Sequence, residues 1–257
     1  MALVVGSGFI YRDDQSIPLI ASGTANAAAH LWYNCAMCGR FDIHSAIEII
    51  ARFFQIDIID CDLKPNYNVA PSQDIPIVVR DGRQNRLISS HWGFLPSWAT
   101  EKKTAYSMIN ARAETVDTNR SYKDSFENHR CLIVADGFYE WLKQDKVKIP
   151  YYTRLKSKNP MGFAGLYNNW TSPEGETICT STIITTDANE LIKPLHDRMP
   201  VILHQDDFRL WLNPDEQDKG ILLPLLNPFP SEELEAYRVT AKVNSFKYNK
   251  PDTIEPV

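Results

Sequence analysis

The sequence predicts an α+β fold with a mostly β core and added helices. Strand-length segments rich in β-branched and aromatic residues recur from Ile75 onward, separated by turn residues such as Asp81 and Gly82. Residues 45–56 instead carry apolar side chains at helical spacing. No internal repeat or Ser/Gly-rich linker marks a second domain. A single domain from Met37 onward is therefore the simplest account.

Each element has its own local signal. Ser45 and Glu48 predict a capping box at the start of the first helix. Residues 60–74, rich in Pro, Asn and Asp, are typical of a loop. Residues 189–192 and 205–211 are predicted to form short helices. Strands are predicted at 75–80, 86–92, 131–141, 150–155, 162–167, 177–186 and 201–203.

Composition limits the class of protein. The longest apolar runs, such as residues 131–135, are strand-sized and far short of the ~18 to 20 residues that a membrane span needs. A net charge of -5 argues against a strongly basic protein that coats duplex DNA, but is compatible with a local basic groove. Five cysteines form an odd, sparse set that favours a reducing compartment, so we expect a cytoplasmic or nuclear protein without a membrane partner.

Residues 1–36 differ from the rest of the chain. Polar residues at 11–15 interrupt any signal-peptide hydrophobic region, and no basic stretch precedes them. Residues 21–29 are a run of mostly small residues, after which a denser pattern begins at Met37. We expect residues 1–36 to be a leader that is absent from the active protein, and residues 37–257 to form the domain.

Three polar clusters stand in apolar surroundings, at residues 110–114, 136–141 and 196–200. On a strand, Glu140 shares a face with Phe138, and burial in an apolar wall would raise its pKa toward the range of a general acid. The alternative is a glutamate at a strand end in a salt bridge. Pattern alone leaves both interpretations open.

The other polar candidates have similar alternatives. His196, in a turn-like segment, has the side chain suited to exchange a proton near neutral pH, although a lone histidine is often structural. Arg112 and Arg198 suit phosphate binding. Each is equally suited to pair with a nearby carboxylate. The candidate carboxylates are Asp136, Glu114 and Asp197.

Aromatic and sulfur-containing residues complete the set. Trp92 and Trp98 offer faces on which unpaired bases stack, at ~1 to 3 kcal/mol per base, or they pack in the core. Cys35 and Cys38 spell C-x-x-C, but no second pair follows at zinc spacing and no βαβ pattern suggests a thioredoxin motif. No metal site is expected.

Seven segments, in this order, resemble the SRAP (SOS-response-associated peptidase) family over essentially all of residues 37–257. Each is weak alone, but the ordered set is specific. The resemblance implies a single SRAP-type domain with a mostly antiparallel, barrel-like β core and flanking helices. The segments are residues 37–41 (MCGRF), 67–71 (YNVAP), 92–98 (WGFLPSW), 109–114 (INARAE), 136–141 (DGFYEW), 196–200 (HDRMP) and 254–257 (IEPV).

The resemblance implies a DNA-damage function. In the SRAP family the initiator methionine is removed, and the exposed cysteine captures the ring-opened aldehyde of an abasic site in single-stranded DNA as a covalent thiazolidine. That five-membered ring needs an amine and a thiol on adjacent carbons, which only an N-terminal cysteine provides. Its α-amine, with a pKa of ~8, is also more often neutral at pH 7 than a lysine at ~10.4. The implied protein works as a monomer without a cofactor.

The resemblance also implies roles for particular residues. Cys38 would be the nucleophile and Glu140 the proton shuttle. His196 would assist sugar opening and crosslink reversal, and Asn110 would orient the amine and the lesion. The remaining matches would hold DNA: Arg40, Arg112 and Arg198 the phosphates, and Asn68, Pro71, Trp98 and Thr185 the groove or lesion pocket.

Two departures from the family pattern matter. Thirty-six residues precede Met37, so either Met37 is the true start, or the leader is cut off, or it stays and the thiazolidine activity is lost. Ala99 stands where some relatives carry a second aromatic residue, so one stacking surface is expected to be missing.

Two other functions remain open. A cysteine peptidase or amidohydrolase would use Cys38 and His196 with Glu140 or Asn110, and would include self-removal of the leader. A non-enzymatic module would bind single-stranded DNA or protein without a working cysteine. A capture protein would be associated with the nucleoid in a bacterium and nuclear in a eukaryote.

Overall fold

The computed structural model describes residues 38–145 and 147–257, so the leader, Cys35 and Met37 lie outside the described residues. The helices are α2 (Ile47–Phe53), α3 (Lys123–Asn128), α4 (Phe208–Leu212) and α5 (Lys219–Leu222), with short 3-10 helices η1 (Lys102–Ser107), η2 (Gln205–Asp207), η3 (Leu223–Leu226), η4 (Ser231–Glu233), η5 (Ala241–Asn244) and η6 (Pro251–Ile254). The strands are β1 (Phe41–Ile43), β2 (Ile58–Ile59), β3 (Asn66–Val69), β4 (Asp74–Asp81), β5 (Gln84–Trp92), β6 (Asn110–Arg112), β7 (Arg130–Ala135), β8 (Gly137–Gln144), β9 (Val147–Leu155), β10 (Met161–Thr171), β11 (Thr177–Asp187), β12 (Arg198–Pro200), β13 (Ile202–Leu203) and β14 (Leu234–Arg238).

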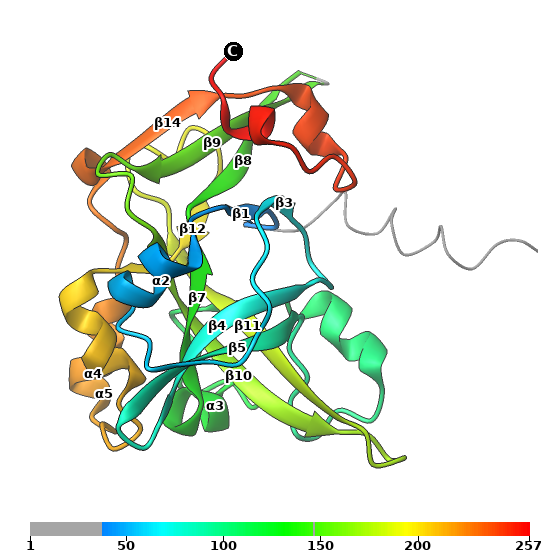
Figure 1. The fold of residues 1–257 in the computed structure, drawn as a ribbon, viewed down its shortest axis with the longest axis vertical. Helices are drawn as coiled ribbons and strands as arrows, with labels where there is room; N and C mark the ends of the chain where they lie inside the picture. The colour runs from blue at the N-terminus through cyan, green and yellow to red at the C-terminus, as the bar shows by residue number, and fades with distance from the viewer. Residues whose placement is uncertain (1–37, 146) are drawn as a thin grey trace, which may run out of the picture. The chain divides into compact units, whose positions relative to one another are not determined.

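Five strands close into a barrel in the order β4, β5, β11, β10, β7 (Figure 1). Four of the five contacts around this ring are antiparallel. The parallel pair β5–β11 closes the ring, with His91 opposite Thr180 and Trp92 opposite Ser181. The predicted α+β fold with a mostly antiparallel, barrel-like core is thereby confirmed.

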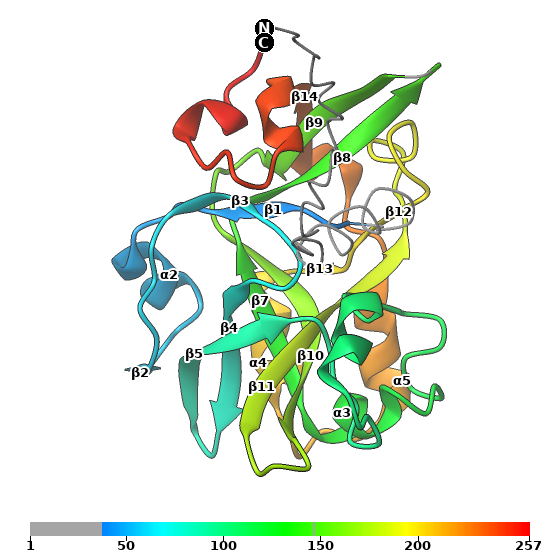
Figure 2. The same cartoon turned by 90° about the vertical axis from the view of Figure 1, so that its right-hand side faces the viewer.

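A second, fully antiparallel sheet has the order β14-β9-β8-β1-β3. Figures 1 and 2 both show β8, β9 and β14, with the red C-terminal segment, beyond one end of the barrel. The two sheets are joined directly, because β7 passes into β8 through Asp136. The single strand predicted over residues 131–141 is therefore two strands.

Strand β1 is held against the barrel by aromatic packing. The Phe41 ring lies 5.0 Å from Trp92 and 6.1 Å from Phe163, centroid to centroid, and all three side chains are buried. The Trp92 indole N–H donates to the Ile109 carbonyl at 3.0 Å. Trp92 therefore packs in the core, which was the alternative to base stacking. Because Cys38 precedes β1 by a few residues, the same packing limits where Cys38 can lie.

Some predicted helical features were wrong. Helix α2 begins after Ala46, and no side chain caps it. The Ser45 hydroxyl instead donates to Asp136 at 2.5 Å, because this carboxylate is buried and needs donors. The helix predicted at 189–192 is absent, since residues 190–195 form turns, whereas 205–211 correspond to η2 and α4 as predicted. Within the described part of the chain, no helix has the length and apolar character to cross a membrane.

Candidate functional site

Strand pairing brings Cys38 to Glu140. In the β1–β8 ladder Phe41 lies opposite Phe138, and the Tyr139 N–H donates to the Arg40 carbonyl at 2.9 Å. One step further along the two chains, the backbone nitrogen of Cys38 donates to Glu140 Oε1 at 2.9 Å. Sheet register, rather than nearness in sequence, therefore builds this contact.

The Glu140 carboxyl is deeply buried, with 3% of the residue exposed. Burial raises the pKa of Glu140 to about 8, partly offset by N–H donors from Cys38 and Trp141, and the charge of Asp197 raises it further. No ion pair joins Glu140 to another described residue. The prediction of a glutamate buried in an apolar wall is thus confirmed over the salt-bridge alternative, and the carboxyl is mostly protonated at pH 7.

Cys38 has unusual surroundings for a cysteine nucleophile. Only 1% of the residue is exposed, and burial, followed by the charge of Glu140, raises the pKa of its thiol well above the usual value. The sulfur therefore stays a thiol at neutral pH. The backbone φ of Cys38 is 44°, in the left-handed region that a non-glycine residue rarely adopts.

His196 and Asn110 come from neighbouring elements of the barrel. His196 Nδ1 lies 3.0 Å from the backbone nitrogen of Arg198 and 3.0 Å from Asp197 Oδ1. Because the Asp197 charge influences the pKa of Glu140, the His196 turn lies within electrostatic range of that carboxyl. Asn110 begins β6 and pairs with Ile183 on β11. The roles of His196 and Asn110 remain predictions.

The Arg198 guanidinium is used inside the protein. Its two terminal nitrogens donate to Glu114 at 2.6 and 2.9 Å, to Asp187 at 2.7 Å and to the Thr185 carbonyl at 2.6 Å. These two carboxylates neutralise the charge that was predicted to hold a DNA phosphate. Of the two interpretations of Arg198, pairing with a carboxylate fits these contacts better than phosphate binding. Glu114 was one of the predicted carboxylate partners.

Arg40 and Asn68 also bind within the fold. Arg40 Nη1 donates to Asn68 Oδ1 at 2.7 Å and to the Val243 carbonyl at 2.9 Å. The Asn68 amide donates to the carbonyls of Val243, Ser245 and Tyr248. Asn68 is fully buried and anchors the C-terminal segment, and its expected role in lining a DNA groove remains a prediction.

The other predicted DNA-contacting residues differ in exposure. Thr185 is fully buried in β11, where its hydroxyl donates to the Ala111 carbonyl at 3.3 Å and so supports β6. Pro71 is half-buried in the turn after β3. Trp98 is 46% exposed and Arg112 is exposed at the end of β6. Trp98 and Arg112 are thus the predicted residues that present the most surface to a ligand.

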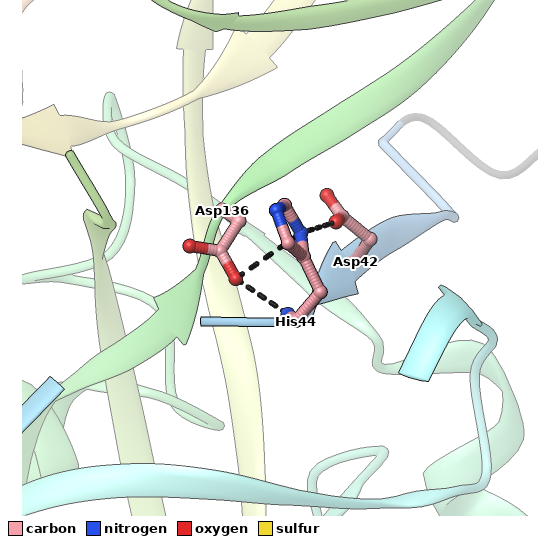
Figure 3. Close-up of side chains that lie close together, drawn as sticks. All are labelled: Asp42, His44 and Asp136. Atoms are coloured by element: carbon pink, nitrogen blue, oxygen red, sulfur yellow. Dashed lines mark hydrogen bonds and ion pairs between the residues drawn. The ribbon is translucent and has the colours of Figure 1, made fainter. Parts of the chain in front are cut away.

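The structure also contains a network that pattern analysis missed (Figure 3). The Asp42 carboxylate accepts hydrogen bonds from His44 Nδ1 at 2.6 Å and from the Tyr152 hydroxyl at 2.9 Å. Asp136 Oδ2 accepts the backbone N–H groups of His44 at 2.5 Å and Ser45 at 2.7 Å. Asp42 in β1 and His44 just after it are two residues apart, which is a signal in the sequence, but Asp136 is 94 residues further along the chain than Asp42.

Electrostatics support a structural role for this network. Burial raises the pKa of Asp42 to about 6 against the lowering effect of His44, and the hydrogen bond to Asp42 raises the pKa of His44. The side chains of Asp42, His44 and Asp136 lie close enough together to share a metal ion. However, all four carboxylate oxygens already accept hydrogen bonds from the protein. The arrangement is therefore that of a satisfied hydrogen-bond network.

Gly137 makes room for this network. A Cβ at this position would lie 2.4 Å from the Cζ and hydroxyl oxygen of Tyr152 and 2.6 Å from the Thr153 carbonyl oxygen. The missing side chain thus lets the Tyr152 ring cross β8 and reach Asp42. The glycine of the DGFYEW segment is explained by this close approach.

The family model described as "SOS response associated peptidase (SRAP)" matches residues 37–246. The chain belongs to the SRAP family. Among SRAP relatives, the abasic site processing protein YoqW of Bacillus subtilis is 47% identical over 222 residues, covering 85% of this chain and 99% of YoqW. The abasic site processing protein HMCES of Xenopus tropicalis is 32% identical over 225 residues, covering 76% of this chain and 67% of HMCES.

A solved structure shares the SRAP fold seen here. A crystal structure of a protein from Bacteroides thetaiotaomicron superposes with a TM-score of 0.75 at 29% identity, covering 86% of this chain and 100% of that one. The family resemblance first suggested by the seven segments is thus confirmed at the level of sequence and of fold.

Proposed function

We propose that this SRAP protein captures abasic sites in single-stranded DNA by forming a thiazolidine with Cys38 as its N-terminal residue. The observation that carries the proposal is the 2.9 Å hydrogen bond from the Cys38 nitrogen to the buried Glu140 carboxyl. This nitrogen belongs to a peptide in the full chain and becomes the α-amine once the preceding residues are absent. The names of YoqW and HMCES, both abasic site processing proteins, support the proposal.

Glu140 has the pKa that a proton shuttle to this amine needs. An N-terminal amine has a pKa of ~8, and burial raises the pKa of Glu140 to about 8. The value for Glu140 is that of the full chain, where Cys38 presents a neutral peptide N–H; beside an N-terminal ammonium the two groups titrate as a coupled pair that shares one proton. In its ionised form Glu140 takes a proton from the ammonium, which leaves the neutral amine that attacks the aldehyde.

The reaction then balances without a further reactant. The amine adds to the aldehyde carbon, and protonated Glu140 gives its proton to the resulting hydroxyl, which leaves as water. The Cys38 sulfur adds to the imine carbon, and the thiol proton passes through Glu140 to the ring nitrogen. One aldehyde and one aminothiol become a thiazolidine and water. The raised pKa of the Cys38 thiol suits this order, because the thiol is needed only after the imine has formed.

We propose that residues 38–257 are the active domain and that the preceding segment is absent from it. The family match begins at residue 37, which supports this boundary. Backbone strain supports it as well, since a φ of 44° costs a non-glycine residue on the order of 1 kcal/mol. An N-terminal residue has no preceding peptide and is free of that cost.

The proposed DNA path uses the exposed residues Trp98 and Arg112, with Pro71 at its margin. His196 would assist sugar opening and Asn110 would orient the lesion. Arg40 and Arg198 would act by holding these elements in place, because their guanidinium groups bind within the protein. The proposed form is a monomer acting on single strands, with lyase-like chemistry.

The thiol argues against the peptidase alternative. Cysteine peptidases attack with a thiolate whose pKa is lowered by a neighbouring cation. Here burial and Glu140 raise the pKa of Cys38, which is the opposite direction. Covalent capture through the amine does not need a thiolate at the start, so it fits the site better.

Intact-protein mass spectrometry tests the proposal, using natively expressed protein and a single-stranded oligonucleotide with one abasic site. We expect a chain that begins at Cys38 and gains the mass of the oligonucleotide less one water. A Cys38→Ala control keeps the amine, so we expect only an imine that borohydride traps.

Of three alternative outcomes, two would contradict covalent capture, whereas peptide hydrolysis that removes the leader can coexist with it. A chain that retains the leader and gains no mass would refute it for that form. Hydrolysis of a peptide without DNA would favour the peptidase. Equal binding to intact and abasic strands, with no covalent product, would favour a binding module.

A further inference from the structure

Trp98 is exposed although the loop that carries it is firmly held. The Leu95 N–H donates to Thr180 Oγ1 at 3.1 Å, and the Trp170 indole N–H donates to the Ala99 carbonyl at 2.7 Å. Leu95, Ala99 and Trp170 belong to one buried cluster. The backbone on both sides of Trp98 is thus fixed, while 46% of Trp98 remains exposed. A rigid, exposed indole is a surface on which an unpaired base stacks.

Arg120 lies over this indole. Its guanidinium carbon is 5.8 Å from the centroid of the Trp98 ring, within cation–π range. Arg120 is exposed, and its side chain makes no hydrogen bond or ion pair with any described residue. Of the acids nearest in sequence, Asp117 pairs with Lys219, and Asp124 accepts from the Asn128 side chain at 3.4 Å and forms no ion pair with Arg120. The positive charge of Arg120 is therefore available to an anion.

Tyr122 connects this pair to the candidate site. Its hydroxyl donates to the Asn110 carbonyl at 3.1 Å, and its ring centroid lies 5.4 Å from that of Phe94. Phe94 belongs to the loop that carries Trp98, and Asn110 begins β6. The segment with Arg120 is therefore packed against both the Trp98 loop and the strand expected to hold the lesion.

We propose that Arg120 contacts a backbone phosphate of single-stranded DNA next to a base that stacks on Trp98. The inference rests on the proposed function and extends its DNA path by one residue. Proteins that bind single strands combine stacking side chains with cations that follow the backbone. Here Trp98 is the stacking side chain, Arg120 is the cation, and the two side chains contact each other.

The test measures binding of the full chain to an undamaged, fluorescently labelled single strand over a range of salt concentrations. We expect Arg120→Ala to weaken binding about two- to fivefold, the range for one exposed ion pair. We also expect the slope of log K against log salt to become shallower by ~0.7, the value for one phosphate contact to a single strand. Arg120→Lys should restore the slope because it keeps the charge.

Arg83 provides a matched control. It is an exposed arginine in the turn between β4 and β5, without a hydrogen bond or ion pair to described residues. Nine residues of extended chain separate it from Trp92, a distance of roughly 30 Å. Arg83→Ala removes the same charge from the molecule, so we expect it to leave the salt slope unchanged.

The outcomes separate the two proposals. An unchanged salt slope in Arg120→Ala, with normal circular dichroism, would overturn the role of Arg120 even if abasic DNA is captured. Normal strand binding without covalent capture would overturn the proposed function and leave Arg120 supported. A wild-type chain that binds no single strand would overturn both.

Discussion

Strand β1 has a buried carboxyl site at each end, and the two sites differ in their partners. Near Cys38, Glu140 accepts backbone N–H groups and forms no ion pair with a described residue, and burial raises its pKa to about 8. At the other end, Asp42 has His44 at 2.6 Å, and its pKa rises only to about 6. A buried carboxyl with a cationic partner stays charged at neutral pH and fixes structure. A buried carboxyl without one keeps a proton that it can exchange.

The largest effect is expected from Glu140→Gln. The amide keeps an acceptor for the Cys38 nitrogen but cannot transfer a proton, so we expect the rate of abasic-site capture to fall by ~10² to 10⁴. Timed denaturing gels with an abasic single strand measure this rate. A variant that captures at the wild-type rate would show that Glu140, like Asp42, is structural.

Asp136→Ala tests the structural end of β1. It leaves the Ser45 hydroxyl and the N–H groups of His44 and Ser45 without their acceptor, so we expect a loss of about 2 to 4 kcal/mol in the free energy of unfolding. Urea denaturation measures this change in the free energy of unfolding. Asp62→Ala, which removes an exposed ion pair with Lys64, is the control and should change stability by less than about 1 kcal/mol.

The pH dependence of stability sharpens the comparison. Since the pKa of Glu140 rises from its usual 4.5 to about 8 on folding, the folded chain binds the extra proton between these values and loses stability as the pH rises through them. From pH 6 to pH 8 we expect the full-length chain to lose about 2 kcal/mol, at about 1.4 kcal/mol per pH unit.

Glu140→Gln serves as the control for this pH effect. The variant has no proton to release at this position, so its unfolding free energy should depend less on pH over the same range. The raised pKa of His44 also makes the folded protein less stable as the pH rises, and it does so equally in the wild type and the variant. Equal slopes in the two proteins, measured by urea denaturation, would contradict the assignment of the raised pKa to Glu140.

The smallest effect is expected from His44→Asn. It removes one hydrogen bond to a buried carboxyl, which is mostly ionised at pH 7, so we expect a loss of about 1 kcal/mol in the free energy of unfolding at that pH. The capture rate should hardly change, because His44 lies at the other end of β1 from Cys38. A large loss of capture at unchanged stability would instead tie the two ends of β1 together functionally.

Much of the fold was predictable because strands and turns carry local signals. The strands of the barrel were foreseen, apart from the break at Asp136, which depends on donors from residues 44 and 45. The strands missed were β1, β2, β3, β6, β12 and β14; all but β14 have two to four residues, too few to show a clear alternation. The capping role of Ser45 was wrong because a distant carboxylate competes for its hydroxyl.

The sequence by itself determined the family and the chemistry available at Cys38, because both are properties of residue type and local pattern, whereas the burial of Glu140 was settled by the structure. Only the tertiary structure decided which groups meet. It placed the Cys38 nitrogen against a carboxyl 102 residues away, neutralised Arg198 with Glu114 and Asp187, and buried Asn68. Such contacts depend on strand register and barrel closure, which many weak interactions set together and no single segment encodes.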